Sequence, residues 1–306
     1  MGTPLAVAAP VADALSAGRP VVALESTIIS HGLPRPRNLT AARDFEAILT
    51  GMDVTPATIA VLDGTLKVGL TDDELRRVAE DDDVVKVSVR DLPVVIARGA
   101  SGATTVAATS YIAHLAGVRV FSTGGLGGVH REAGQTFDES ADLSVLARTP
   151  ITVVSAGVKS ILDIPATLER LETLSVTVLG YGTDRFPSFW LTDSGEQLDW
   201  SVPDAPAVAE VMAAADGLGR DAAILVANPL PVDEQLDPGV HDSALADALA
   251  SAEAAGVTGK EVSPYLLAKM VEITGGESLE VNLRIAANNI TVGGRIATAW
   301  ATRGRA

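Results

Sequence analysis

A lysine flanked by small and apolar residues is the strongest indication of chemistry in the sequence. Lys159 stands in Ser155-Ala-Gly-Val-Lys159-Ser-Ile-Leu-Asp163, directly after the aliphatic run 151–154. Removal from water disfavours a charged ammonium, and the neutral amine is the nucleophile of enzymes that form Schiff bases. Taken alone, Lys159 is equally compatible with catalysis and with binding a phosphate.

Two other charged residues are placed unusually with respect to predicted strands. Glu25 directly follows the apolar run 21–24, and Lys86 lies among the valines of 84–89. Burial of Glu25 would raise the pKa of its carboxyl into the range that suits a general acid. If the sheet is covered on both faces, the charged end of Lys86 must extend to an end of the sheet or contact an anion. The structural alternatives are an ion-paired or helix-capping Glu25 and an edge-strand Lys86 that opposes aggregation. If Lys86 approaches Lys159, their repulsion lowers the pKa of the amine further.

A glycine-rich segment follows the predicted strand that ends at Phe121. Its sequence, Ser122-Thr-Gly-Gly-Leu-Gly-Gly-Val-His-Arg131, includes Thr123, Gly124 and Gly125. Backbone amides in such a segment can approach an anionic oxygen, although glycines also serve simply to make a sharp turn. The segment lacks the Gly-Lys-Ser/Thr of a Walker loop and the context of a dinucleotide-binding motif. His130 is a candidate proton carrier, with a structural hydrogen-bonded histidine as the alternative.

Closely spaced oxygen ligands follow in Thr136-Phe-Asp138-Glu-Ser140-Ala-Asp142. Carboxylates with a hydroxyl between them suit a hard divalent ion such as Mg²⁺ or Mn²⁺, with waters completing its coordination shell. Zinc is not favoured, because no cluster of imidazoles is present. Asp142 precedes a predicted helix, so capping the start of that helix is its structural alternative.

The elements that must position these residues alternate along the chain. We expect strands at seven apolar runs and helices between them, and from Gly239 onward mostly helices, with Gly275 and Gly276 separating two of them. Near-continuous apolar strands are typical of a sheet covered on both faces, whose ligands bind where the strands' carboxyl ends converge. The seven expected strands are 21–25, 58–62, 84–89, 118–121, 151–154, 177–179 and 223–226.

Local signals add detail to this fold. Asp63-Gly64 predicts a hairpin, which makes the sheet mixed, and Thr71 to Glu74 is a capping box that begins a helix. A helix is expected over 104–115, with Gly117 in a left-handed conformation just beyond it. The prediction is a three-layer α/β/α sandwich with a mostly parallel, mixed central sheet. Residues 1–306 are expected to form a single α/β catalytic domain, with 1–19 as a helical or loosely ordered N-terminal extension.

Composition limits the classes of function. Of 306 residues, 47% are hydrophobic, and 39 acidic against 23 basic residues give a formal net charge of −16. That charge argues against nucleic-acid binding through phosphate neutralisation but not against a small phosphorylated ligand. The absence of cysteine excludes disulfides and a thiolate nucleophile. No signal peptide or membrane-spanning stretch is recognisable, so a cytoplasmic protein without a membrane partner is expected.

Taken together, many ordered segments resemble those of the pseudouridine-5'-phosphate glycosidase family, also called indigoidine synthase A-like. The resemblance runs from about Val21 to the last predicted helix, which makes it far more specific than any one motif. Its segments are 23–32 (Ala-Leu-Glu-Ser-Thr-Ile-Ile-Ser-His-Gly), 86–93, 102–107, 122–131, 136–143, 155–163, Val226-Ala-Asn-Pro229, Gly259-Lys-Glu261 and 274–279.

The resemblance implies reversible cleavage of the C–C glycosidic bond of pseudouridine 5'-phosphate, giving uracil and ribose 5-phosphate. It implies a homotrimer with one Mn²⁺ per subunit, for which Mg²⁺ or another hard divalent ion could substitute. Lys159 falls on the family's Schiff-base nucleophile, Glu25 on its proton donor and Asp138 on its metal ligand. The residues placed in the substrate pocket are Lys86, Val106, Thr123, Gly124, Gly125, His130, Ser140, Ala141, Asp142 and Asn282.

The sequence departs from the family pattern at two positions near these motifs. Glu132 stands where a glycine is expected after His130-Arg131, and Ser101 replaces an expected asparagine. Glu132 places a charge beside the glycine-rich segment and so bears on ligand access. Two other functions remain open for the same residues. One is a lysine-dependent aldolase-type enzyme acting on a phosphorylated sugar, and the other is a non-catalytic sugar-phosphate sensor in which Lys159 only contacts the anion.

Overall fold

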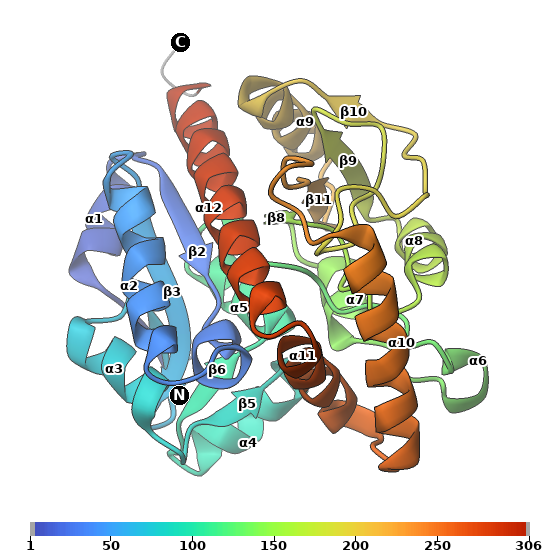
Figure 1. Cartoon of the computed structure of the whole chain (residues 1–306). Helices are drawn as coiled ribbons and strands as arrows, with labels where there is room; N and C mark the ends of the chain where they lie inside the picture. The colour runs from blue at the N-terminus through green and yellow to red at the C-terminus, as the bar shows by residue number, and fades with distance from the viewer. Residues whose placement is uncertain (1–3, 304–306) are drawn as a thin grey trace.

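Short strands alternate with helices through residues 4–303, the part of the chain that the computed structural model describes (Figure 1). Within it the strands form one 11-stranded sheet in the order β1-β4-β3-β2-β7-β8-β11-β9-β10, with β6 joined to β3 and β5 to β6. The strands are β1 (Leu5–Val7), β2 (Val21–Leu24), β3 (Thr55–Leu62), β4 (Thr65–Val68), β5 (Val85–Val87), β6 (Gly102–Thr104), β7 (Val120–Ser122), β8 (Thr152–Ser155), β9 (Thr177–Tyr181), β10 (Ser201–Val202) and β11 (Ile224–Ala227).

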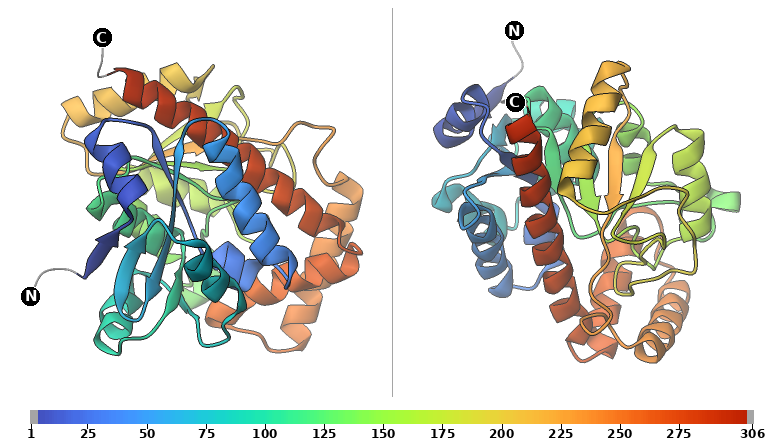
Figure 2. Two further views of the ribbon diagram at one scale, coloured as in Figure 1. Left: turned by 90° about the vertical axis from the view of Figure 1, so that its left-hand side faces the viewer. Right: turned by 90° about the horizontal axis from the view of Figure 1, so that it is seen from above.

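Helices cover both faces of the sheet (Figures 1 and 2). The longest, α12, crosses one face beside α2 and α9, whereas α5 packs on the opposite face. The helices are α1 (Ala9–Ser16), α2 (Arg37–Thr50), α3 (Asp72–Glu80), α4 (Leu92–Ala97), α5 (Val106–Leu115), α6 (Ala133–Thr136), α7 (Ala141–Leu146), α8 (Ile164–Thr173), α9 (Ala205–Gly217), α10 (Pro238–Ala254), α11 (Val262–Ile273) and α12 (Glu277–Arg303).

The period of two along each strand explains why the sheet has two apolar faces. In β2, Val21 and Ala23 pack in one hydrophobic cluster with residues of α1 and α5, and Val22 and Leu24 pack in another with residues of α2 and α12. Alternate side chains of a strand point to opposite faces, so a continuous apolar run suits a strand buried on both sides. The predicted α/β/α sandwich with a mixed, mostly parallel sheet is therefore confirmed, since β4 and β6 are antiparallel to β3.

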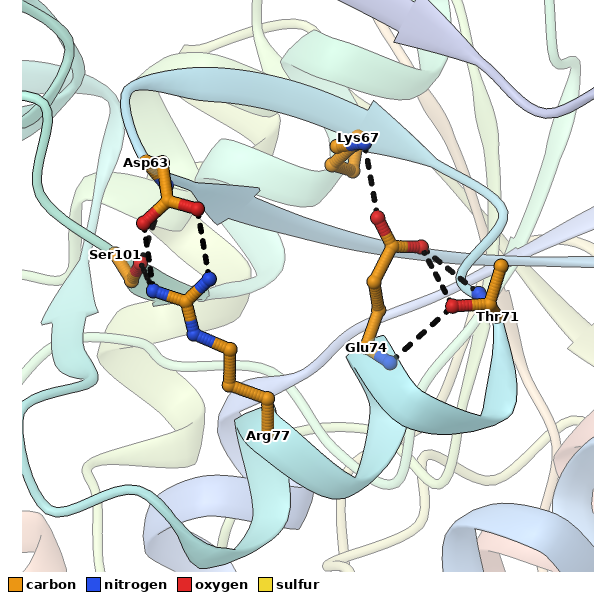
Figure 3. Close-up of polar contacts among 6 residues, drawn as sticks. All are labelled: Asp63, Lys67, Thr71, Glu74, Arg77 and Ser101. Atoms are coloured by element: carbon orange, nitrogen blue, oxygen red, sulfur yellow. Dashed lines mark hydrogen bonds and ion pairs between the residues drawn. The ribbon is translucent and has the colours of Figure 1, made fainter.

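The predicted turn and helix ends are present. Asp63 and Gly64 both have positive φ, at 49° and 74°, and join β3 to β4 in an antiparallel hairpin. The capping box at the start of α3 is formed by Thr71 and Glu74, and Lys67 pairs with the same glutamate (Figure 3). Gly117 follows α5 with φ of 85°, which is the left-handed conformation that glycine adopts without steric cost.

The prediction for residues 1–19 requires a correction. The helix that it allowed is present as α1, but Leu5–Val7 is a strand that pairs in parallel with β4, so this segment belongs to the sheet. Residues 1–3 lie outside the described part of the chain. The strand β6 was not predicted, and the strand expected over 84–89 is limited to β5, because a three-residue helical turn over Val89–Asp91 follows it. No helix among residues 4–303 is both long and apolar enough to cross a bilayer.

Candidate active site

A cavity of about 470 Å³ opens where the chain leaves the carboxyl ends of β2, β7 and β8. Parallel strands place the residues that follow them at one edge of the sheet, which is where ligands of open α/β sheets bind. All but one of the predicted site residues line this cavity. They are Glu25, Lys86, Val106, Gly124, Gly125, His130, Asp138, Ser140, Ala141, Asp142, Lys159 and Asn282.

Glu25 follows β2 directly and lies beside Thr123, the predicted residue that does not line the cavity. The Thr123 hydroxyl donates a hydrogen bond to the Glu25 carboxylate from behind the cavity wall. Burial raises the pKa of Glu25 above its usual value, and this outweighs the opposing effects of Lys159 and of the Thr123 hydrogen bond. A carboxyl with a raised pKa retains its proton closer to neutral pH, as a general acid requires.

Lys159 follows β8, which β7 separates from β2 in the sheet, and reaches the same cavity. Its Nζ donates a hydrogen bond to the carbonyl of Gly125 at 2.5 Å. Burial lowers the pKa of Lys159, and Lys86 lowers it further, although Glu25 and Asp142 act in the opposite direction. The amine therefore loses its proton more readily than an exposed lysine, which favours nucleophilic attack.

The side chain of Asp142 connects two segments of the cavity wall by binding their backbone amides. Its two carboxylate oxygens accept hydrogen bonds at 2.9 Å from the amides of Ala107 and Gly127. Its own helix, α7, is capped instead by Ser140, whose hydroxyl accepts from the Asp142 amide at 3.2 Å. The carboxylate thus holds the first turn of α5 and the glycine-rich segment in place. Asp142 was predicted to cap its own helix, α7, but its carboxylate binds an amide of α5 instead.

Lys86 lies on β5, which within the described chain pairs only with β6, so the expectation of an edge-strand lysine also holds. The side chain is exposed, lines the cavity and has no hydrogen-bond or ion-pair partner among residues 4–303. Nearby His31, on the helical turn Ile28–Gly32, has a pKa that is lowered by burial and then by the charge of Lys86. An unpaired cation at a cavity rim can accept a phosphate without first breaking an ion pair.

Asp138 and His130 lie on the two sides of α6 in the chain, and 3.9 Å separates Nδ1 of His130 from a carboxylate oxygen of Asp138. Among residues 4–303, no three His, Asp or Glu side chains converge as a ready-made metal cage.

Asn282, on α12, has a buried side-chain oxygen without a hydrogen-bond partner in the same part of the chain. A buried, unpaired amide oxygen in a cavity wall is suited to accept an N–H from a ligand.

Comparison with known proteins bears on this site. Residues 10–299 match the family model described as indigoidine synthase A-like protein. The chain belongs to the indigoidine synthase A-like family. A relative from Frankia alni is 60% identical over 98% of this chain and 83% of its own length. One from Salinispora tropica is 60% identical over 96% and 91%. Both are named pseudouridine-5'-phosphate glycosidase.

Two solved structures have the same fold as this chain. The prealnumycin C-glycosynthase AlnA, in complex with ribulose 5-phosphate, superposes with a TM-score of 0.91 at 36% identity over 98% of both chains. An indigoidine synthase A-like protein from Thermotoga maritima superposes with a TM-score of 0.85 at 33% identity, covering 92% of this chain and 93% of that one. The α/β/α architecture is thus shared by proteins that differ from this chain at most positions.

The two departures from the family pattern lie outside the cavity lining. Glu132 is exposed at the start of α6. Ser101 accepts hydrogen bonds from the Asp63 amide and the Arg77 guanidinium, which itself pairs with the Asp63 carboxylate (Figure 3). Ser101 therefore stabilises the β3–β4 hairpin rather than contacting a ligand.

Sequence reasoning assigned no role to three parts of the cavity wall. His31 is part of the segment 23–32 that resembles the family. Its position shortly after Glu25 and the end of a predicted strand could have indicated that it lies at the site. Phe189 is buried with φ of 65°, and its ring lies against Gly124 and Gly125, so a Cβ at Gly125 would collide with it. Ser263 and Leu267 come from α11, and nothing in their local sequence indicates a site.

Proposed function

We propose that this protein is a pseudouridine-5'-phosphate glycosidase that cleaves its substrate reversibly through a covalent imine at Lys159. The observation that carries the proposal is the pairing of Lys159 and Glu25 in one cavity, with pKa shifts in opposite directions. A neutral amine and a protonated carboxyl are thereby available together, which is the combination that cleavage of a carbon-linked base needs.

The chemistry explains why two carboxylates would not suffice. Departure of a carbon-linked uracil leaves electrons on a ring carbon, which must receive a proton as the bond breaks. In the proposed reaction the Lys159 amine bonds to C1' as the C1'–O4' bond breaks, and O4' takes up a proton from the amine. The bond from C1' to C5 of uracil then breaks, the nitrogen lone pair forms the imine, and Glu25 gives its proton to C5 of the departing base. The resulting imine is hydrolysed by water, which releases ribose 5-phosphate and regenerates the amine. Ordinary glycosidases act instead on oxygen- or nitrogen-linked groups with a carboxylate pair.

The cavity offers separate groups for the two ends of the substrate. Lys86 is an unpaired cation at the rim, and Val106, the first residue of α5, lines the same cavity. We assign the phosphate to this side. The unpaired oxygen of Asn282 can accept an N–H of uracil, and His130 also lines the cavity. The ribulose 5-phosphate bound by AlnA, a 36% identical protein of the same fold, supports a phosphorylated sugar as the ligand class.

We further propose that Asp138 holds a hard divalent ion, Mn²⁺ or Mg²⁺. A single carboxylate in the cavity wall fits an ion that keeps most of its waters, and does not fit an all-protein cage. Such an ion supplies positive charge and oriented waters beside the substrate when it is bound. Glu139 is ion-paired with Arg170 at 2.9 Å, whereas the carboxylate of Asp138 has only His130 nearby, at 3.9 Å.

The proposal is tested by incubating the protein with Mn²⁺ and pseudouridine 5'-phosphate and measuring uracil and ribose 5-phosphate. Wild type is expected to form both products in equal amounts, and Lys159→Arg, which keeps the charge but cannot form the imine, is expected to form none. Binding without turnover in wild type would indicate a sensor. Cleavage of phosphorylated sugars but not of pseudouridine 5'-phosphate would indicate an aldolase-type enzyme.

A further inference from the structure

Two buried asparagines lie beneath the cavity and do not line it. Asn289, on α12, is fully buried, and Asn228, which directly follows β11, is 4% exposed. The Asn228 side chain donates a hydrogen bond at 2.9 Å to the side-chain oxygen of Asn289. Burying amides costs free energy unless their hydrogen bonds are satisfied, so a pair of this kind in an aliphatic core indicates a specific role.

Outside the backbone bonds of α12, the remaining hydrogen bonds of Asn289 reach residues 122–124, which precede Gly125, the partner of Lys159. Its side-chain nitrogen donates to the carbonyls of Thr123 at 2.8 Å and Gly124 at 3.1 Å. Its own backbone carbonyl accepts from the hydroxyl of Ser122 at 3.1 Å. The close approach that this requires is possible because position 293 is glycine, where a Cβ would collide with Ser122. Helix α12 is thereby joined to residues 122–124 at three successive positions.

These three positions determine where the partners of the catalytic residues lie. Thr123 has its amide bound to the carbonyl of Val154 at 3.0 Å and its carbonyl bound to Asn289, so its hydroxyl is directed towards Glu25. Gly125, one peptide beyond Gly124, supplies the carbonyl that accepts from Lys159. A glycine-rich segment has little side-chain packing of its own and much conformational freedom, so external hydrogen bonds must restrict it.

We propose that Asn289, oriented by Asn228, is a positioning residue that holds the 122–125 segment so that Thr123 and Gly125 align Glu25 and Lys159. The inference deepens the proposed function and rests on it for the roles of those two residues. Asn228 belongs to the Val226-Ala-Asn-Pro229 motif, to which the reaction itself gives no part. It also fixes the end of β11 by donating its backbone amide to the carbonyl of Ser155 at 2.8 Å.

The first test compares Asn289→Ala with Asn288→Ala as a matched control. Asn288 is the adjacent residue of α12, and its side chain donates to the carbonyl of Pro229 at 3.1 Å. We expect Asn289→Ala to lower kcat between about tenfold and 100-fold with a smaller change in KM, because misalignment impairs the reacting groups rather than substrate contacts. The control should keep wild-type kcat. An equal loss of kcat in both variants, or a change in KM alone, would overturn the inference.

A double-mutant cycle tests whether the effect passes through Thr123. In a Thr123→Val background the hydroxyl is absent, so the additional fold-loss caused by Asn289→Ala should be much smaller than in wild type. Independent fold-losses that multiply in the double variant would contradict the proposed path. If Asn289→Ala does not fold, Asn228→Ala is used in its place. It leaves both Asn289–carbonyl bonds in position, and a smaller effect in the same direction is expected.

A titration of the Glu25 carboxyl by carbon NMR decides the inference even if wild type does not cleave pseudouridine 5'-phosphate. The Thr123 hydrogen bond lowers the pKa of Glu25, so its loss in Asn289→Ala should raise that pKa, with Lys159, Asp142 and Lys86 still facing the carboxyl. The control Asn288→Ala should titrate as wild type. An unchanged Glu25 pKa in a folded Asn289→Ala protein would refute the positioning role. Failure of wild-type turnover would count against the proposed function only.

Discussion

At the scale of single residues, Glu25 and Lys159 depend on each other. Burial raises the pKa of the carboxyl and lowers that of the amine, while the charge of each partner acts against both shifts. The two pKa values are thus brought towards each other, which increases the population with a protonated acid and a neutral amine. Both groups behave in this way because each is buried in the wall of the same cavity, at the ends of β2 and β8.

Removing the carboxylate should separate bond cleavage from imine formation. Glu25→Gln is expected to lower the rate of cleavage about 10²- to 10⁴-fold, because the group that we propose as the proton donor to the base is lost. The Glu25 charge raises the pKa of Lys159, so its removal should lower that pKa and let the amine react with ribose 5-phosphate at lower pH than in wild type. Steady-state kinetics and adduct yield against pH measure the two effects. Adduct formation shifted to higher pH would contradict this electrostatic account.

At the scale of elements, the site depends on where strands end, and this much could be predicted. Each of the seven expected strands is present, and Glu25 and Lys159 were recognised because each follows one directly or closely. The strands β1, β6 and β10 were missed because they have two or three residues and gain their stability from distant partners. Periodicity cannot identify so short a segment, since its conformation is decided by tertiary contacts.

Helix α3 offers a prediction about stability without activity. Thr71→Ala removes the side chain that accepts from the amide of Glu74 and should lower the free energy of unfolding by about 1 kcal/mol. Neither residue lines the cavity, so kcat should be unchanged. Thr71→Ser keeps the hydroxyl and serves as the control. Denaturant unfolding of the three proteins gives the comparison, and equal stability of the alanine and serine variants would show that the capping box contributes nothing.

At the scale of the whole molecule, the cavity gathers residues from position 25 to position 282. Phe189 and Leu267 enter it from segments whose local sequence resembles ordinary core, and Asn289 supports it from below. Sequence alone could not place these residues, because their roles arise only when α11 and α12 pack over the end of the sheet. The family resemblance supplied Asn282 for the same reason, since its position in a helix gives no local signal.

The assembly of the chain is a prediction at this scale. The family resemblance implies a homotrimer, and large apolar side chains such as Phe137, 86% exposed, and Trp200, 69% exposed, remain on the surface of one chain. Light scattering coupled to size exclusion should give a mass three times that of the chain, constant over a wide range of protein concentration. A mass equal to one chain across that range would contradict the trimer.

The central claim is that Lys159 presents an uncharged amine that bonds covalently to a phosphorylated pentose, and borohydride trapping tests it most directly. The protein is incubated with ribose 5-phosphate, reduced and digested, and the peptides are mapped by mass spectrometry. The account predicts a stable pentose-phosphate adduct on Lys159, none on the exposed Lys86, and none at position 159 in Lys159→Arg. An unmodified Lys159 in wild-type protein that is shown to be turning over substrate would contradict it.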